Sequence, residues 1–137
     1  MTETGDIKVG YQLPVIRKEM SLAKSRLYSL PMESFHTHEK LAKKAGLPFI
    51  VPQGMMSYGY LSEMCTLFFG NEWAKGGTLK VKFTGLLRID DILTSHGVVK
   101  EITEIGQEKK EIVLDIWVEN QRGEKVAIGT ASGFLLS

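Results

Sequence analysis

Two clusters of residues between Met32 and Met56 contain the groups best suited to acid–base chemistry in this 137-residue sequence. The first is the loop segment MESFHTH, in which His36 is a candidate general base. The second is VPQGMM, in which an extended segment turns into a helix at Gln53 and Gly54. A glycine at that turn lets a ligand approach the backbone closely, and the first amides of a helix lack helical partners.

The amides of Gly54, Met55 and Met56 are therefore candidate donors to an oxygen that becomes negative during a reaction. A base and such donors, placed together, suit proton abstraction or water addition next to a carbonyl group. The segment EKLAKKAG is a short helix that ends in Gly-Leu-Pro, and it can fold the histidine loop back toward the glycine. Each cluster also has a structural interpretation, in which the histidines are solvated and Gln53 only caps the helix.

The histidine pair is a weak indication of a metal site. His36 and His38 are close in sequence, but apart from the adjacent Glu39 no cysteine or carboxylate stands at metal-ligand spacing. We expect Cys65, inside an apolar run, to be a buried thiol, and His96 to be structural or exposed. A single cysteine excludes an internal disulfide framework and suits a reducing, cytoplasmic environment.

Composition indicates a compact soluble protein, and we treat residues 1–137 as one domain, with residues 1–9 flexible. Hydrophobic residues make up 43% of the chain and charged residues 24%, values typical of globular proteins. The formal net charge of +1 gives no indication of a nucleic-acid or membrane surface. No apolar stretch is long enough to span a bilayer, and the polar first residues show no signal-peptide pattern.

The elements that must position the two clusters are a buried helix and a set of strands. Leu13–Met20 is predicted to be a strand, followed by a helix that Ser21 caps and Pro31 ends. The segment 55–70 is apolar nearly all round, which predicts a helix buried on most faces. Alternating apolar residues predict the remaining strands, which begin near 77, 94, 109 and 125, with a hairpin turn at 121–124.

The predicted order of elements, a strand, then helices, then about four strands, indicates an α+β fold. A strongly curved antiparallel sheet can wrap a single apolar helix, burying one face of the sheet and nearly all of the helix. The other face of the sheet then stays in contact with water. This arrangement explains why the strands alternate between apolar and polar residues while the central helix does not.

The sequence resembles the MaoC-like, hot-dog-fold acyl-thioester dehydratases and hydratases, including the R-specific enoyl-CoA hydratases, over most of its length. HTHEKLAKKAGLPFIVPQGMM is similar to the family's hydratase motif, Asp-x-Asn-Pro-x-His followed by a short helix, Gly-x-Pro and a His/Gln-Gly-Met step. GGTLKVKFTGLLRIDDIL resembles the next family strand, which ends in an Asp-rich turn. GTASGFL resembles the final strand.

The resemblance implies a hot-dog fold, a curved antiparallel sheet around a long central helix, with dimers joined edge to edge and active sites at the dimer interface. It implies reversible syn hydration of a trans-2-enoyl thioester of coenzyme A or acyl carrier protein. No cofactor is implied beyond the coenzyme A of the substrate. The motif histidine corresponds to His36, and the glycine whose amide polarises the thioester carbonyl corresponds to Gly54.

The motif is incomplete, because Pro31 stands at the position of the family aspartate, and Glu33 and Ser34 replace the asparagine and the proline. Glu33 is the nearest carboxylate and is either a replacement for the missing acid or a solvated loop residue. Three functions remain open. They are a hydratase that uses His36 with Glu33 or a partner's acid, a catalytically incomplete subunit paired with an active homologue, and an acyl-CoA thioesterase.

The substrate-binding residues that the sequence suggests lie on the central helix and on the short basic helix. Gln53, Met55 and Tyr58 are candidates to line the acyl site, where Tyr58 would shorten a tunnel or reshape it for a ring-bearing acyl group. Candidates for the phosphates of coenzyme A are Lys40, Lys43 and Lys44, for which a solvated basic face is the alternative. The acyl chain length, the carrier, the pathway and the choice between homodimer and heterodimer remain open.

Overall fold

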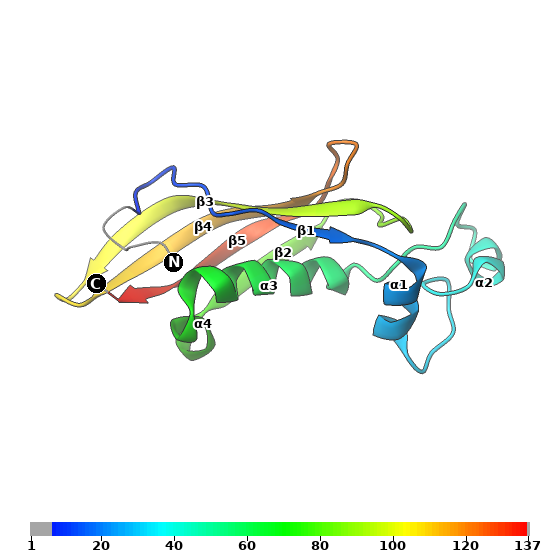
Figure 1. The fold of residues 1–137 in the computed structure, drawn as a ribbon, viewed down its shortest axis with the longest axis horizontal. Coiled ribbons are helices and arrows are strands. Elements are labelled where there is room, and N and C mark those ends of the chain that lie inside the picture. The colour runs from blue at the N-terminus through cyan, green and yellow to red at the C-terminus, as the bar shows by residue number, and fades with distance from the viewer. Residues whose placement is uncertain (1–6, 137) are drawn as a thin grey trace.

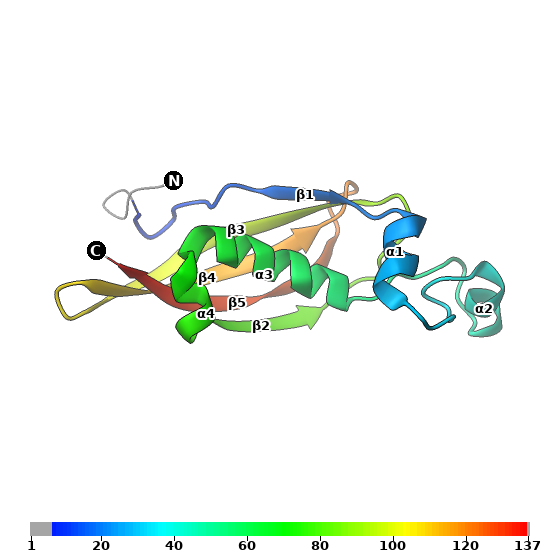
Figure 2. The same cartoon turned by 60° about the horizontal axis from the view of Figure 1, so that its bottom comes forward.

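The computed structural model describes residues 7–136 as a five-stranded antiparallel sheet that bends over one long helix (Figures 1 and 2). The strands are ordered β1-β3-β4-β5-β2, and each neighbouring pair is antiparallel. Their bounds are β1 Ile16–Glu19, β2 Thr78–Phe83, β3 Ile92–Ile105, β4 Lys109–Glu119 and β5 Lys125–Leu136. This arrangement confirms the predicted α+β architecture, although the first strand is shorter than the predicted Leu13–Met20.

The chain forms four helices between β1 and β2: α1 Leu22–Ser29, α2 Glu39–Lys44, α3 Met55–Phe69 and α4 Asn71–Gly76. The predicted helix signals are confirmed, since the Ser21 hydroxyl accepts a hydrogen bond from the Lys24 amide and Gly46, just beyond α2, has a φ of 82°. α4 was not predicted, because Gly70 looks like the end of helical structure while the chain resumes a helix directly after it. Within residues 7–136, no helix is long and apolar enough to cross a membrane.

α3 packs against the inner face of the sheet along one side only (Figure 2). Leu61 and Cys65 on that side are fully buried in the core. Most of α3 is buried or half-buried, as predicted, although Leu67 is 72% exposed and Met55 is 47% exposed. The apolar surface on the outer side of α3 is therefore larger than the core of a single chain requires.

Two glycines in the sheet allow α3 to lie close to the strands. A Cβ atom built on Gly97 of β3 would lie 3.1 Å from the terminal methyl of Met64. A Cβ atom on Gly133 of β5 would lie 3.0 Å from the ring of Phe69. Side chains of α3 therefore occupy the space that larger residues of β3 and β5 would take, which fixes the position of the helix along the sheet.

Alternation along β4 matches the sequence pattern. The buried members are Ile112, Leu114, Ile116 and Val118. The outward members include Asp115 and Trp117, whose neighbours across the sheet also point away from α3. Residues 1–6 of the segment predicted to be flexible, 1–9, lie outside the described residues, while the side chain of Ile7 is buried in the core.

Candidate functional site

Helix α1 joins the two clusters that the sequence singles out. Ser25 and Ser29 lie one turn apart on α1, and both are buried. The Ser25 hydroxyl donates a hydrogen bond to the backbone carbonyl of His36 at 2.7 Å. The side-chain amide of Gln53 donates to the Ser29 hydroxyl at 2.8 Å. The histidine loop and the start of α3 are therefore tied to the same face of one short helix.

The imidazole of His36 is held by the segment that leads into α3. Its Nδ1 atom lies 2.6 Å from the carbonyl oxygen of Val51, and the Val51 amide donates to the carbonyl of Phe35 at 3.2 Å. Because a carbonyl oxygen can only accept, this contact places the proton of the neutral ring on Nδ1. The other ring nitrogen, Nε2, is then free to accept a proton, as a general base must be.

The start of α3 offers two unpaired backbone donors. Within residues 7–136, the amides of Gly54 and Met55 donate to no acceptor. The prediction that the Met56 amide is a third free donor is wrong, because this amide donates to the carbonyl of Gln53 at 3.0 Å. Gly54 has helical dihedral angles, and a Cβ atom on it would lie 3.4 Å from the ring of Phe83. Two adjacent donors at the positive end of a helix suit an oxygen that gains negative charge.

Glu33 lies beside His38. One of its carboxylate oxygens is 4.0 Å from Nε2 of His38, and the glutamate side chain is 74% exposed. Across the described part of the chain, no aspartate or glutamate oxygen comes within 4.0 Å of a ring nitrogen of His36. Pro31, at the position of the family aspartate, cannot provide an acid. One chain therefore holds a candidate base and two free donors on segments that are both hydrogen-bonded to α1, without a carboxylate in contact with the base.

The expected substrate-binding residues fall into two places. Met55 and Tyr58 lie on the first turns of α3 next to the free amides, and Tyr58 is half-buried. The lysines proposed for phosphate binding are exposed on α2, where Lys43 pairs with Glu39 at 3.3 Å. Among residues 7–136, no group of three or more His, Cys, Asp and Glu side chains is arranged to hold a metal ion.

Cys65 takes no part in the candidate site. It lies on the buried side of α3, and burial raises the pKa of its thiol to about 12. A thiol with so high a pKa stays protonated at neutral pH and is a poor nucleophile. The prediction of a buried, structural cysteine is confirmed.

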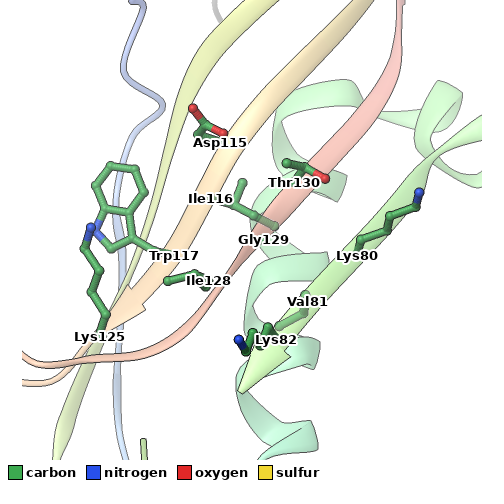
Figure 3. A pocket seen from close by; sticks show the side chains of 10 residues that line it. All are labelled: Lys80, Val81, Lys82, Asp115, Ile116, Trp117, Lys125, Ile128, Gly129 and Thr130. Carbon is green, nitrogen blue, oxygen red and sulfur yellow. The ribbon is translucent and has the colours of Figure 1, made fainter. Parts of the chain in front are cut away.

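A hollow of about 680 Å³ lies on the outer face of the sheet, away from α3 (Figure 3). Side chains of β2, β4 and β5 surround it, including Lys80, Lys82 and Trp117. The indole of Trp117 packs against side chains of the same chain. The His96 ring stacks on it with ring centroids 5.1 Å apart, and Nζ of Lys125 lies 5.1 Å from its centroid. No residue of the candidate site lines this hollow, and we assign the chemistry to the α1–α3 end of the molecule.

The sequence analysis missed the two serines of α1, although they connect the site. The available signal was the spacing of Ser25 and Ser29, which puts two small polar residues on one face of a predicted helix. The apolar residues Leu27 and Leu30 at the end of that helix are exposed. Polar contacts with the histidine loop and with Gln53 therefore hold the buried face of α1.

The curved antiparallel sheet around one long helix is a hot-dog fold. Residues 5–121 match the family model described as the MaoC like domain. The chain belongs to the MaoC-like domain family, and the family and fold suggested by the sequence are confirmed.

Solved structures with the same fold share little sequence with this chain. A MaoC-like dehydratase from Rhodospirillum rubrum superposes with a TM-score of 0.79 at 19% identity, covering 97% of this chain and 95% of that chain. The (R)-hydratase from A. caviae involved in PHA biosynthesis gives a TM-score of 0.76 at 17% identity, covering 96% and 98%. The ChsH1–ChsH2 complex from Mycobacterium tuberculosis gives a TM-score of 0.71 at 15% identity, covering 95% and 98%. No curated protein matches the sequence significantly.

Proposed function

We propose that the protein is an acyl-thioester dehydratase or hydratase, which adds water reversibly to a 2-enoyl thioester of coenzyme A or acyl carrier protein. The observation that carries this proposal is that α1 ties His36 and the free amides at the start of α3 to one helix face. Membership of the MaoC-like domain family supports it. The reaction needs no cofactor beyond the carrier of the substrate, and a cytoplasmic location accords with the single, unpaired cysteine.

In the hydration direction, the amides of Gly54 and Met55 donate hydrogen bonds to the thioester carbonyl oxygen and draw electrons from the conjugated double bond. Nε2 of His36 takes a proton from a water molecule while the water oxygen forms a bond to C3 of the acyl group. The electrons of the double bond move to the carbonyl oxygen, where the two amides stabilise the enolate. The proton then passes to C2, which restores the carbonyl and the neutral imidazole.

The contact between Nδ1 of His36 and the Val51 carbonyl has a role in this sequence of steps. In the neutral ring it places the proton on Nδ1, which leaves Nε2 as the acceptor, and it holds the ring in one orientation. When Nε2 takes the proton of water, the Val51 carbonyl also faces the positive charge of the imidazolium. The same contact therefore supports the base before and after proton transfer.

A second candidate function follows from the missing carboxylate. Pro31 and the outward Glu33 leave His36 without an acid partner in the described chain. Exposed apolar side chains surround this end of the molecule, including Leu27, Leu30 and Met32. Such a surface suits a second hot-dog chain, and one structure with this fold is a complex of two proteins, ChsH1 and ChsH2. The chain would then bind the acyl thioester and complete its site with a homologue.

The deciding experiment follows the absorbance of the conjugated thioester when the pure chain meets crotonyl-CoA. Hydratase function predicts that His36→Ala lowers the rate by on the order of 10² or more. His96→Ala is the matched control, because that histidine stacks on Trp117 on the outer face of the sheet. Turnover only after a homologue is added supports the second candidate. Release of free thiol without hydration supports a thioesterase instead.

A further inference from the structure

A second hollow, of about 380 Å³, opens beside the segment that leads to Val51 and its contact with His36. It lies between the starts of α1 and α2, the segment 48–50 and the loop before β3. The residues that line it are Leu22, Glu39, Pro48, Phe49, Ile50, Arg88 and Ile89. The lining is apolar apart from one acidic and one basic side chain, which suits a ligand with an apolar body and a charged end.

Arg88 gives this hollow a positive charge, which acts on Glu124 at longer range but forms no ion pair within the described residues. Its guanidinium lies 4.4 Å from the centroid of the Phe49 ring, a cation–π contact. Among residues 7–136, no carboxylate comes within 4.0 Å of the Arg88 side chain, whereas Glu39 is paired with Lys43 at 3.3 Å. The planar N–H fork of an arginine held against a ring is well suited to binding a phosphate.

The backbone that carries Arg88 is fixed by a buried carboxylate. The Arg88 amide donates to Asp91 at 3.1 Å, and Asp91 is almost fully buried. Arg122, in the turn between β4 and β5, donates to both oxygens of Asp91 at 2.9 and 3.3 Å. Arg88 is therefore presented from an anchored loop, which reduces the entropy lost when its guanidinium binds a ligand.

The hollow lies within reach of the reaction centre. Phe49 precedes Val51 by two residues, so the Cα atoms of Phe49 and Val51, whose carbonyl contacts His36, are at most about 7 Å apart. Gly54 follows Phe49 by five residues, at most roughly 18 Å away. The arm that carries acyl groups, 4′-phosphopantetheine, has its thioester at one end and its phosphate at the other, with two amides and a dimethyl carbon between them.

We infer that the hollow between Phe49 and Arg88 binds the phosphate end of the 4′-phosphopantetheine arm, with the Arg88 guanidinium as the phosphate-binding group. This inference rests on the proposed function and deepens it by naming the part of the carrier that the chain recognises. The Phe49 ring holds the guanidinium and contacts the apolar middle of the arm. Coenzyme A and acyl carrier protein share this arm, so the recognition applies to both carriers.

The test compares three crotonyl thioesters, those of coenzyme A, of phosphopantetheine and of pantetheine, which lacks the phosphate. Arg88→Ala is expected to raise KM for the two phosphate-bearing substrates by on the order of tenfold, with kcat changed less than about twofold. The same variant should leave KM for the pantetheine thioester unchanged. Arg88→Lys keeps the charge without the planar fork and should fall between the two.

Arg17→Ala is the matched control, because Arg17 is an exposed arginine of β1 that forms no ion pair within the described residues. It should leave all three KM values at the wild-type level. Equal effects of Arg88→Ala on all three thioesters would overturn the inference. So would an effect confined to coenzyme A, which would place Arg88 against the nucleotide instead of the arm.

Binding measured without turnover separates this inference from the proposed function. Calorimetric titration of each variant with crotonyl-CoA and crotonyl-pantetheine needs no catalysis, and urea unfolding shows whether the variants keep their fold. If Arg88→Ala binds crotonyl-CoA more weakly than the wild type does, binds crotonyl-pantetheine equally well, and the wild type hydrates neither thioester, the inference stands and the proposed function is rejected. Hydration of crotonyl-CoA by Arg88→Ala at the wild-type KM rejects the inference and keeps the function.

Discussion

Replacing Ser25 by alanine tests whether α1 positions the candidate site. The substitution removes the hydroxyl that donates to the His36 carbonyl at 2.7 Å in a buried position. Loss of such a bond with one partner left unsatisfied costs about 1–3 kcal/mol. Alanine regains about 0.5 kcal/mol through its higher helix propensity. We therefore expect Ser25→Ala to lower the free energy of unfolding by about 0.5–2.5 kcal/mol.

Thr66→Ala is the matched control for this prediction. The Thr66 hydroxyl also donates to a backbone carbonyl, that of Ser62 at 2.8 Å, but on the exposed side of α3. Water can replace that donor, so the control should change the free energy of unfolding by less than about 0.5 kcal/mol. Urea unfolding followed by tryptophan fluorescence measures both values.

The same variant should lose catalytic rate beyond its loss of stability. The Ser25 contact fixes the backbone of His36, and a small displacement of a catalytic group has a large effect on the rate. We expect kcat for crotonyl-CoA to fall by about tenfold at a temperature where Ser25→Ala is fully folded. Equal unfolding free energies for Ser25→Ala and Thr66→Ala, together with unchanged kcat, would refute the role that we assign to α1.

Three further predictions concern other parts of the molecule. Burial would raise the pKa of Asp91, but hydrogen bonds from Arg122, Gln121 and the Arg88 amide outweigh this effect and lower the pKa. Asp91→Asn should therefore lower the free energy of unfolding in urea by about 3 kcal/mol at pH 7. The difference between the variant and the wild type should shrink as the pH falls below about 3.9, because the wild-type carboxylate is then protonated. Gly129→Ala should destabilise the chain by about 2 kcal/mol or more in thermal unfolding, because the new Cβ would meet the Lys80 carbonyl oxygen of the neighbouring strand. Cys65 should react with a thiol reagent only when the protein unfolds, and rapid labelling of the native chain would contradict its burial.

Sequence patterns predicted the elements whose signals are local. The alternation of Ile112, Leu114, Ile116 and Val118 identified β4, because side chains in a strand point to opposite faces in turn. Ser21 and Gly46 marked helix ends because capping depends on residues within a few positions of each other. These signals were sufficient for the α+β class and for the order of the elements apart from α4.

The sequence could not predict contacts between residues that are far apart in the chain. Glu33 was a reasonable replacement for the missing acid by position, yet the fold of the loop turns it toward His38 and into solvent. Arg88 was part of a strand-like run, and only the tertiary structure places its guanidinium on the ring of Phe49. The sequence could not predict that Leu67 is exposed for a similar reason. An apolar helix surface has the same sequence pattern whether it is covered by the core or by another chain.

The bridge between Asp91 and Arg122 has a consequence for variation in the β4–β5 turn. A turn remote from the reaction centre is normally free to change in length and charge. Here Arg122 of the turn and the amide of Arg88 donate to the same buried carboxylate, Asp91, so the turn helps to hold the loop that presents Arg88. An insertion in this turn should leave the sheet intact and yet weaken the binding of the carrier phosphate that we propose for Arg88. A folding assay alone would not reveal this defect.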